Sequence, residues 1–260
     1  MEFEDIIYEK REHIAKVMLN RPKTLNSMRP KTWGELIAAF EDAGADKKVG
    51  VVVLTGTGRS FCAGGDIHEF ADIAGDKGID LAEQVIKWNY VARTLPKPII
   101  AAVNGLCYGY GNELLIVCDM AIASEDAIFC QPEMIVGSSP TSMVDEMLPL
   151  LIGYKRAMEF VVCRREWNAE EAARIGMINK VVPKDKLEEE VNAWCQRILE
   201  GSPQAIKFTK TIMNAHVDML WPVLTLGMRA WTRLHPTEEW REGFHAFLEK
   251  RKPDYEQFRK

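Results

Sequence analysis

The sequence predicts an α/β fold followed by a helical C-terminal region. Short apolar or alternating segments of strand length recur between longer segments with helical patterns, which is typical of strands joined by crossover connections. After residue 184 the strand-like segments stop, while helical patterns continue to the end. We therefore expect an α/β core over residues 1–184 and a helical region over residues 185–260.

The individual elements are predicted from hydrophobic periodicity. Strands are expected at residues 14–20, 49–56, 99–105, 120–124 and 178–182. Helices are expected at residues 31–43, 79–94, 111–118, 141–150, 185–200 and 203–215. The charged tail EKRKPDYEQFRK is expected to be exposed.

Composition and charge argue against several classes of function. The 260 residues carry a net charge of -5, which disfavours nucleic acid as the main partner because phosphate binding needs a basic surface. The chain opens with the acidic segment MEFEDIIYEK, and no apolar run is long enough to span a membrane. The six cysteines form no C-x-x-C pair, which suits reduced and buried thiols. We expect a soluble, cytoplasmic protein.

Two glycine-containing loops each connect a predicted strand to a predicted helix. The first, GTGRSFCAGGDIHEF, leaves the amide of Gly65 unobstructed and places Asp66 where an N-cap is expected. The second, NGLCYGYGNELL, turns through Gly109 and Gly111 into a helix. The first N–H groups of a helix lack partners inside it, so two of them aimed at one point can form an oxyanion hole. Tight turns without a function are the alternative.

Two glutamates, Glu113 and Glu133, interrupt the mostly apolar segment GLCYGYGNELLIVCDMAIASEDAIFCQPEMIVGSS. Burying an unpaired carboxylate costs several kcal/mol. These side chains therefore either point to solvent or belong to a site that uses their protons. For a single glutamate solvent is the default, since charged residues are mostly exposed.

Other motifs are incomplete. GTGRSF has Phe61 where a dinucleotide-binding motif needs its third glycine, and HEFAD lacks the second histidine of a zinc-binding helix. No G-x-S-x-G segment supports hydrolysis through a serine triad. The sequence therefore predicts neither a metal nor a nucleotide cofactor.

Taken together, these segments resemble the enoyl-CoA hydratase/isomerase family, also called the crotonase superfamily. The resemblance runs through LNRPKTLNSM, LTGTGRSFCAGGDI, PKPIIAAVNG, GYGNELLIVCDMAIAS, AIFCQPE, AARIGMINKVVP and EGFHAFLEKRKP. It implies a spiral of ββα turns whose C-terminal helices build trimers, often paired into hexamers. It also implies an acyl-CoA thioester as substrate, with no cofactor besides the CoA that the substrate carries.

The resemblance assigns roles to individual residues. Glu113 would accept a proton from a water that attacks C3 of an enoyl-CoA, and Glu133 would hold that water and deliver a proton to C2. The amides of Gly65 and Tyr110 would stabilise the enolate. The adenine end of CoA would lie near the loop from Lys23 to Met28. The residues expected to bind substrate are Lys23, Thr24, Leu25, Ala63, Asp66, Ile67, Ser138 and His235.

Three departures from the family bear on the substrate. Tyr110 stands in the middle of the usual triple glycine, and VGSSPTSM replaces a glycine-rich stretch, bringing Ser138, Ser139 and Thr141 near the acyl group. The spacer DIAGDKGIDLAEQVIKWNY is aromatic and is expected to line the acyl pocket, although core packing explains its Trp88 and Tyr90 equally well.

Several segments are similar to a subgroup that acts on ring-bearing acyl-CoAs: FEDIIYE, DAGADKKVG, AIFCQ, VGSS and CRREWNAEEAARIGMINKVVP. Ser138 matches a pocket serine of that subgroup, and His235 replaces its tyrosine. Those enzymes generally lack the glutamate pair that this chain keeps. The combination predicts hydration of a cyclic enoyl- or dienoyl-CoA, such as cyclohexa-1,5-diene-1-carbonyl-CoA.

Three alternatives stay open. One is isomerisation of a double bond, and another is C–C bond chemistry or hydrolysis of a ring β-keto acyl-CoA. The third is a non-catalytic scaffold that binds acyl-CoA. The basic residues Lys250, Arg251 and Lys252 could contact CoA phosphates of a neighbouring subunit or simply be solvated. The direction of the reaction and the choice between trimer and hexamer also stay open.

Overall fold

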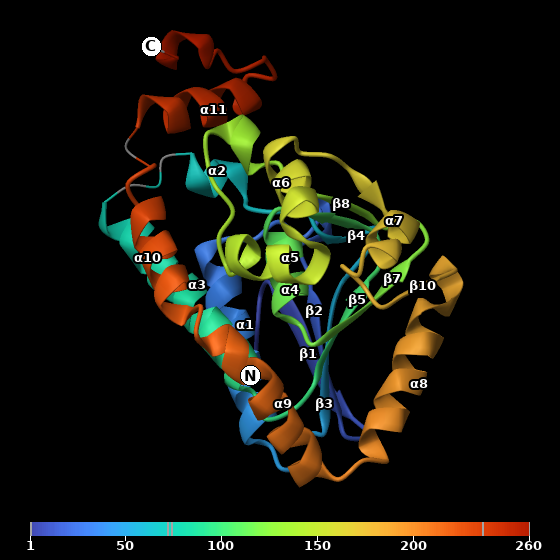
Figure 1. Ribbon diagram of the computed structural model, residues 1–260. Coiled ribbons are helices and arrows are strands. Elements are labelled where there is room, and N and C mark those ends of the chain that lie inside the picture. The colour runs from blue at the N-terminus through green and yellow to red at the C-terminus, as the bar shows by residue number, and fades with distance from the viewer. Residues whose placement is uncertain (1, 72, 74, 236, 260) are drawn as a thin grey trace.

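Two β-sheets organise the fold in the computed structural model, which describes residues 2–71, 73, 75–235 and 237–259 (Figure 1). The larger sheet has six strands, in the order β1 (Ile6–Arg11), β2 (Ile14–Leu19), β3 (Val51–Gly56), β5 (Ile99–Val103), β7 (Met120–Ser124) and β10 (Lys180–Val182). The smaller sheet has four, in the order β4 (Ser60–Cys62), β6 (Leu106–Tyr108), β8 (Ile128–Cys130) and β9 (Trp167–Asn168). Two pairs, β1 with β2 and β8 with β9, are antiparallel, and the others are parallel.

From β3 to β8, successive strands alternate between the two sheets. β3, β5 and β7 lie in the larger sheet, and the strand that follows each of them, β4, β6 or β8, lies in the smaller one. A helical segment follows each pair: α2 (Ile67–Phe70) and α3 (Asp76–Thr94), then α4 (Tyr110–Val117), then η2 (Glu133–Val136) and α5 (Val144–Ile152). This repeat confirms the predicted spiral of ββα turns.

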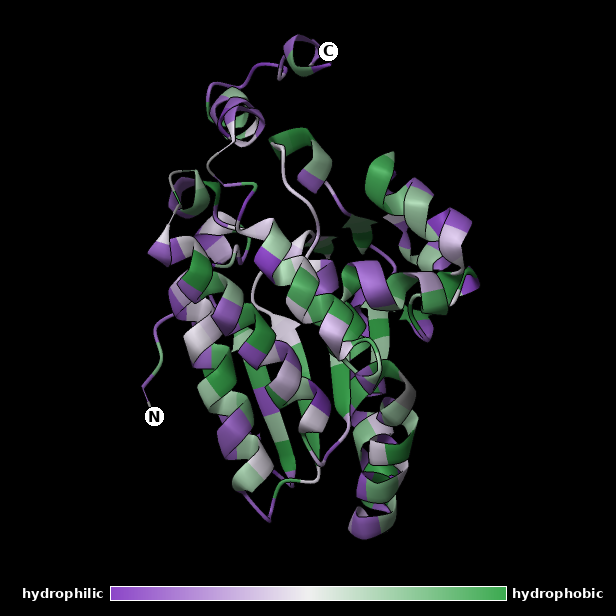
Figure 2. Ribbon diagram, turned by 60° about the vertical axis from the view of Figure 1, so that its left-hand side comes forward, coloured by the Kyte–Doolittle hydropathy of each residue, from purple (hydrophilic) through white to green (hydrophobic). Residues whose placement is uncertain are grey.

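The central strands of the larger sheet are apolar along their whole length because both of their faces are covered. Val51 of β3 belongs to an apolar cluster under α8 (Leu187–Leu199). Its neighbour Val52 points to the opposite face, into the main core, which also contains residues of α1 (Pro30–Ala45). Figure 2 shows these strands as mostly hydrophobic segments between helices of mixed polarity.

The described chain contains only helical segments and loops after β10. These segments are η3 (Lys184–Lys186), α8, α9 (Pro203–Asp218), α10 (Trp221–Trp231), α11 (Glu238–Leu248) and η4 (Glu256–Phe258). α10 packs on α3, and α11 packs on η2 at the opposite end of the molecule from α8 (Figure 1). No helix in the described ranges is long and apolar enough to cross a membrane.

Each strand and helix expected from the sequence is present, with shifted ends. The helix expected at residues 141–150 begins only at Val144, because Ser142 and Met143 have left-handed φ angles of 51° and 66°. The strand expected at residues 178–182 begins at Lys180. The prediction missed the strands β1, β4, β6, β8 and β9 and the helices η1 (Pro22–Thr24), α6 (Tyr154–Val162) and α7 (Ala169–Arg174).

Candidate active site

A cavity of about 370 Å³ brings the two glutamates together. Glu113 lies in the first turn of α4, and Glu133 begins η2. Gly65 and Tyr110 line the same cavity. The two segments that carry the glutamates follow equivalent strands, β6 and β8, which pair in parallel. The spiral therefore places the two carboxyl groups in one site although twenty positions separate them in the chain.

Glu113 is almost completely buried, with 1% of its surface exposed. Each residue of α4 is buried, so Glu113 does not lie on a solvent-exposed face of the helix. The N–H group of Thr141 donates to its Oε1 at 3.0 Å, and the hydroxyl of Thr141 donates to its Oε2 at 2.5 Å. Two donors on one carboxyl group favour its ionised form.

Glu133 approaches the chain just before α4, where Gly109 has a φ angle of 51°. A Cβ atom on Gly109 would lie 2.7 Å from Oε1 of Glu133, so a side chain at this position would displace the carboxyl group. Oε2 of Glu133 is buried and has no hydrogen-bond partner among the described residues. This oxygen is therefore free to bind a ligand or a water in the cavity.

Burial raises the pKa of both carboxyl groups. The pKa of Glu113 lies well above its usual range, first because of burial and second because of the charge of Glu133, while the donors of Thr141 act in the opposite direction. Burial raises the pKa of Glu133 to about 8, and the charge of Asp145 adds to this increase. Two close buried carboxyl groups cannot both ionise at low cost, so the pair tends to share one proton.

The amide N–H groups of Gly65 and Tyr110 donate to no acceptor in the part of the chain that the structure describes. Neighbouring amides are paired: that of Asp66 donates to Met28 O at 2.8 Å, and that of Gly109 donates to Cys130 O at 3.0 Å. Two backbone donors at the edge of one cavity are the geometry that an oxyanion hole requires.

The ring of Tyr110 turns away from this amide into an aromatic cluster. It packs edge-on against Trp33 and Phe70, with ring centroids 5.1 and 5.8 Å apart. The departure from the usual glycine is therefore accommodated by core packing. A Cβ atom on Gly65 would lie 2.8 Å from the ring of Phe70, so glycine is needed at that position.

Three further residues expected to bind substrate, Ala63, Ile67 and Ser138, line the cavity, as do Ser139 and Thr141. Four others, Lys23, Thr24, Leu25 and Asp66, are outside its lining. The carbonyl of Leu25 accepts from the amide of Ala63 at 3.0 Å, which joins this loop to the cavity edge.

The Asp66 side chain has a structural task. Its carboxylate accepts from Arg21 Nη2 at 2.9 Å and from the amide of His68 at 3.3 Å, at the start of α2. Asp66 therefore caps α2, as the sequence predicted, and points toward Arg21.

The structure does not place His235 in the cavity wall. His235 is 3% exposed and packs between Trp231 and Trp240, with ring centroids 4.1 and 4.5 Å away. Burial lowers the pKa of its imidazole to about 4. Trp231 occupies the wall, and His235 lies outside the lining, so the expected substrate contact of His235 is corrected to a packing role.

The described residues of the aromatic spacer before β5, residues 73 and 75–90, also lie outside the cavity lining, and residues 72 and 74 are outside the described ranges. Trp88 is fully buried and packs on Phe40 and Trp33 in the core, with ring centroids 4.7 and 6.2 Å away. Tyr90 is 58% exposed on α3. The packing interpretation is therefore correct for Trp88, whereas Tyr90 is largely exposed, and neither residue lines the cavity as expected.

The sequence interpretation missed the aromatic wall of the cavity. Trp231 of α10 and Trp240, Phe244 and Phe247 of α11 line it, together with Phe70. Trp231 Nε1 donates to Ser138 Oγ at 3.1 Å. The spacing of the α11 aromatics, at steps of four and three residues, indicates one helix face and could have revealed this wall.

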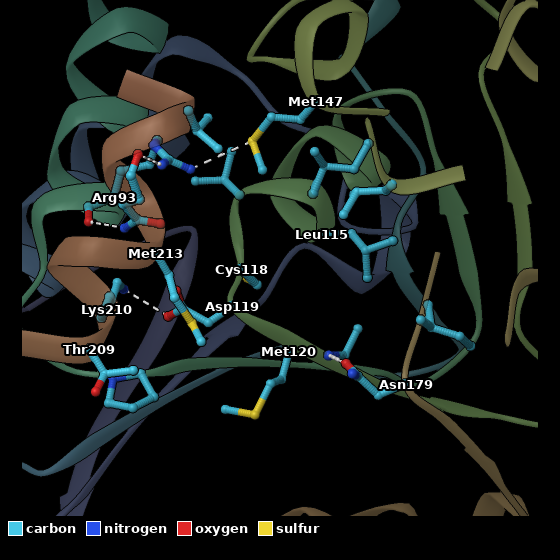
Figure 3. Close-up of a pocket in the computed structure, with 18 of the residues that line it drawn as sticks. Arg93, Leu115, Cys118, Asp119, Met120, Met147, Asn179, Thr209, Lys210 and Met213 are labelled. Carbon is cyan, nitrogen blue, oxygen red and sulfur yellow. Dashed lines mark hydrogen bonds and ion pairs between the residues drawn. The ribbon is translucent and has the colours of Figure 1, made fainter. Parts of the chain in front are cut away.

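A larger cavity of about 730 Å³ lies between α4, β7 and α9 and contains none of the expected site residues (Figure 3). Several of its polar groups are paired with one another. Lys210 Nζ donates to Asp119 Oδ2 at 2.7 Å, and Asn179 Oδ1 accepts from the amide of Ala121 at 2.7 Å. Within the described residues, no group of three or more histidine, cysteine, aspartate or glutamate side chains could hold a metal ion. The smaller cavity is therefore the better candidate for chemistry.

Comparisons with known proteins agree with this geometry. A family model described as enoyl-CoA hydratase/isomerase matches residues 9–259. The solved structure of an enoyl-CoA hydratase from Mycobacterium avium subsp. paratuberculosis is similar with a TM-score of 0.89 and 26% identity, over 97% of this chain and 99% of that chain.

Two other solved structures are similar over comparable lengths. An enoyl-CoA hydratase/isomerase from Xanthobacter autotrophicus gives a TM-score of 0.88 and 29% identity, over 95% of this chain and 94% of that chain. An enoyl-CoA hydratase from Bacillus anthracis gives a TM-score of 0.79 and 30% identity, over 96% of this chain and 98% of that chain.

Proposed function

Since this chain belongs to the enoyl-CoA hydratase/isomerase family, we propose that it is a hydratase that adds water across the C2=C3 bond of an α,β-unsaturated acyl-CoA. The observation that carries this proposal is the pair Glu113 and Glu133 in one buried cavity, next to two amides without partners. Hydration needs a group that takes a proton from water and a group that gives one to carbon, and the cavity holds one carboxyl group for each task.

The thioester oxygen would accept from the N–H groups of Gly65 and Tyr110. When water attacks C3, electrons move from the double bond toward this oxygen and an enolate develops. Donors that are already in place stabilise this charge without rearrangement, and the loss of one costs roughly 3–4 kcal/mol.

The surroundings of the two carboxyl groups suggest how the tasks are divided. Burial raises the pKa of both groups, so we propose that the pair holds one proton between them. The two hydrogen bonds from Thr141 favour the carboxylate at Glu113, which suits it as the base that removes a proton from water. Glu133 has a raised pKa of about 8, so it keeps a proton near neutral pH and suits the acid that protonates C2. The oxygen of water bonds to C3 and one of its protons goes to Glu113, while the proton of Glu133 goes to C2. A later proton transfer from Glu113 to Glu133 restores the starting state. Each group would contribute about 10²–10⁴-fold.

The aromatic lining of this cavity supports a ring as the acyl group. Five aromatic residues form flat apolar surfaces around it: Phe70, Trp231, Trp240, Phe244 and Phe247. Flat apolar walls complement a planar, conjugated ring, and apolar contact supplies most of the binding free energy of such a group. We therefore propose a cyclic enoyl- or dienoyl-CoA as substrate, with cyclohexa-1,5-diene-1-carbonyl-CoA as the first compound to test.

The test is hydration of two substrates, crotonyl-CoA and the cyclic dienoyl-CoA. The loss of conjugated-thioester absorbance reports turnover, and mass spectrometry detects the gain of one water. Glu113→Gln and Glu133→Gln should each lose at least about 100-fold in kcat. Glu170→Gln, an exposed glutamate on α7, is the control and should match the unmodified protein.

Each outcome is informative. Water added to the cyclic substrate, with little turnover of crotonyl-CoA, supports the whole proposal. Preference for crotonyl-CoA keeps the mechanism and removes the cyclic substrate. An isomerised or cleaved product without added water, or no turnover at all, contradicts the hydratase proposal.

The family is typically oligomeric, and we propose that this chain forms the trimer, or dimer of trimers, expected from the sequence. Five large apolar side chains on α9, α10 and the turn between them support self-association, since each is more than half exposed: Phe208, Ile212, Met213, Met219 and Leu226.

A further inference from the structure

The segment that carries Glu133 packs unusually closely against α11. Gly137, which ends η2 with a φ angle of 70°, lies so near α11 that a Cβ atom there would be 2.5 Å from Glu239 O. On the other side of the contact, a Cβ atom on Gly243 would lie 2.5 Å from Val136 O. Each glycine faces the backbone of the other segment, so η2 and α11 are in direct backbone contact. Figure 1 shows α11 lying along this turn.

Hydrogen bonds from the C-terminal region reinforce this contact. The hydroxyl of Tyr255 donates to Ile135 O, inside η2, at 3.0 Å. The amide of Ser138 donates to Glu133 O at 3.0 Å, and the hydroxyl of Ser138 in turn accepts from Trp231 Nε1 at 3.1 Å. The segment that follows Glu133 is therefore attached to the C-terminal region at two points, Ile135 through Tyr255 and Ser138 through Trp231.

The two catalytic carboxyl groups are consequently held by different parts of the molecule. Glu113 is fixed by α4 and by the two donors of Thr141. Oε2 of Glu133 has no protein partner among the described residues, so the direction of this carboxyl group depends on where η2 lies. A small shift of α11 would act on Glu133 directly through η2, whereas Glu113 lies on a different helix, α4.

We propose that the C-terminal region acts in the reaction by positioning Glu133, and that Gly243 and Tyr255 are the positioning residues. This inference rests on the proposed hydratase function. It assigns the last helices a task beyond forming the acyl wall. They set the distance between the acid and the carbon that it protonates.

The first variant is Gly243→Ala, whose added methyl group must push α11 and η2 apart. A displacement of about 1 Å of a catalytic group can cost on the order of 10²-fold in rate, so kcat should fall by about that factor while KM stays within about threefold. Gly34→Ala is the matched control, because this helical glycine has open space around its Cβ position among the described residues. The control should keep both constants.

The second variant, Tyr255→Phe, removes one donor and keeps the ring. Loss of a single neutral hydrogen bond is expected to lower kcat by about three- to tenfold. Both variants are then combined with Glu133→Gln. If they act through Glu133, they should have little further effect in that background, because residues that work as one unit are not additive.

A readout without turnover separates this inference from the proposed function. The infrared C=O band of a protonated carboxyl group, identified by its loss in Glu133→Gln, should disappear with a midpoint near pH 8 in the unmodified protein. Gly243→Ala should move the midpoint to lower pH, since water entering beside η2 reduces the burial that raises the pKa of Glu133. The other titratable groups that act on this carboxyl group are Glu113, Tyr110, Cys130 and Asp145, and both variants leave them in place.

The inference is overturned if Gly243→Ala keeps the unmodified kcat and midpoint, or if its loss of rate persists unchanged in the Glu133→Gln background. A shifted midpoint in a protein that hydrates no acyl-CoA would support the positioning and contradict the hydratase. A loss confined to thermal stability, with kcat intact below the transition, would show that the contact is only structural.

Discussion

The two carboxyl groups of this site differ in their hydrogen-bond donors, because Thr141 donates twice to Glu113 while Oε2 of Glu133 has no partner among the described residues. Thr141→Val removes the hydroxyl that donates to Glu113 but keeps the shape and the backbone donor. A hydrogen bond to a charged group is worth about 1.5–3 kcal/mol, so the pKa of Glu113 should rise by about one unit or more. The acidic limb of the pH profile of kcat/KM should therefore move to higher pH. Thr211→Val, exposed on α9, should leave this limb in place, and an unmoved limb in Thr141→Val would contradict a base at Glu113.

Gly109 offers a second test at the same scale. Gly109→Ala would place a methyl group against Oε1 of Glu133 at a position with left-handed φ. We expect kcat to fall by at least about 100-fold, since the carboxyl group must move. Gly75→Ala is the matched control: its backbone angles, φ 56° and ψ -134°, are close to the 51° and -117° of Gly109 and give a similar strain, but the described residues leave space around it. Equal kcat losses in the two variants would show that backbone strain, and not the carboxyl contact, is responsible.

The residues of the site were predictable to different degrees. Glu113, Glu133 and Gly65 were expected from the resemblance of GYGNELL, AIFCQPE and CAGGDI to the family, and all three line one cavity. Thr141 was expected near the acyl group, but its pairing with Glu113 depends on a loop that returns from a later segment. His235 shows the limit of prediction from sequence. The sequence does not reveal that Trp231, the last residue of α10, lines the cavity while His235 packs against Trp231 outside the lining.

At the level of elements, α11 both packs into the core and lines the cavity, and its phenylalanines contribute to these two roles differently. Phe244 is 4% exposed and stacks on Trp240 with ring centroids 4.3 Å apart, whereas Phe247 is 55% exposed. Both line the cavity. Phe244→Ala should lower the free energy of unfolding by about 3–5 kcal/mol, the cost of removing a buried phenyl ring.

Phe247→Ala is the partner variant and should cost less than about 1 kcal/mol, because most of that ring is already in solvent. Urea unfolding at equilibrium measures both. Similar losses in the two variants would mean that α11 is not anchored through Phe244.

Three of the strands that the sequence did not predict, β4, β6 and β8, share one physical property, which is their short length. β4, β6 and β8 have three residues each, too few to display a period of two. Their strand conformation comes from parallel pairing with one another, which is a property of the folded chain. The longer strands β3 and β5 were predicted because burial on both faces makes them continuously apolar.

For the whole molecule, a protonated buried glutamate makes stability depend on pH. The pKa of Glu133 is about 8 in the folded state and should be near 4.3 in the unfolded state. Between these values the folded state holds a proton that the unfolded state releases, so the free energy of unfolding should decrease as pH rises from about 5 to about 8. Urea unfolding at several pH values measures this slope. It should be smaller in Glu133→Gln, and an equal slope in both proteins would contradict a protonated Glu133.

The division of the cavity between two parts of the chain has an evolutionary consequence. The carboxyl groups and the amides lie on turns of the ββα spiral, whereas most of the aromatic wall lies on α10 and α11. Mutations in the last helices can therefore reshape the space for the acyl group while the reacting groups are inherited unchanged. Descendants of one ancestral catalyst could diversify in this way. The close contact of η2 with α11 limits that freedom, because a new C-terminal region must still accommodate Gly137.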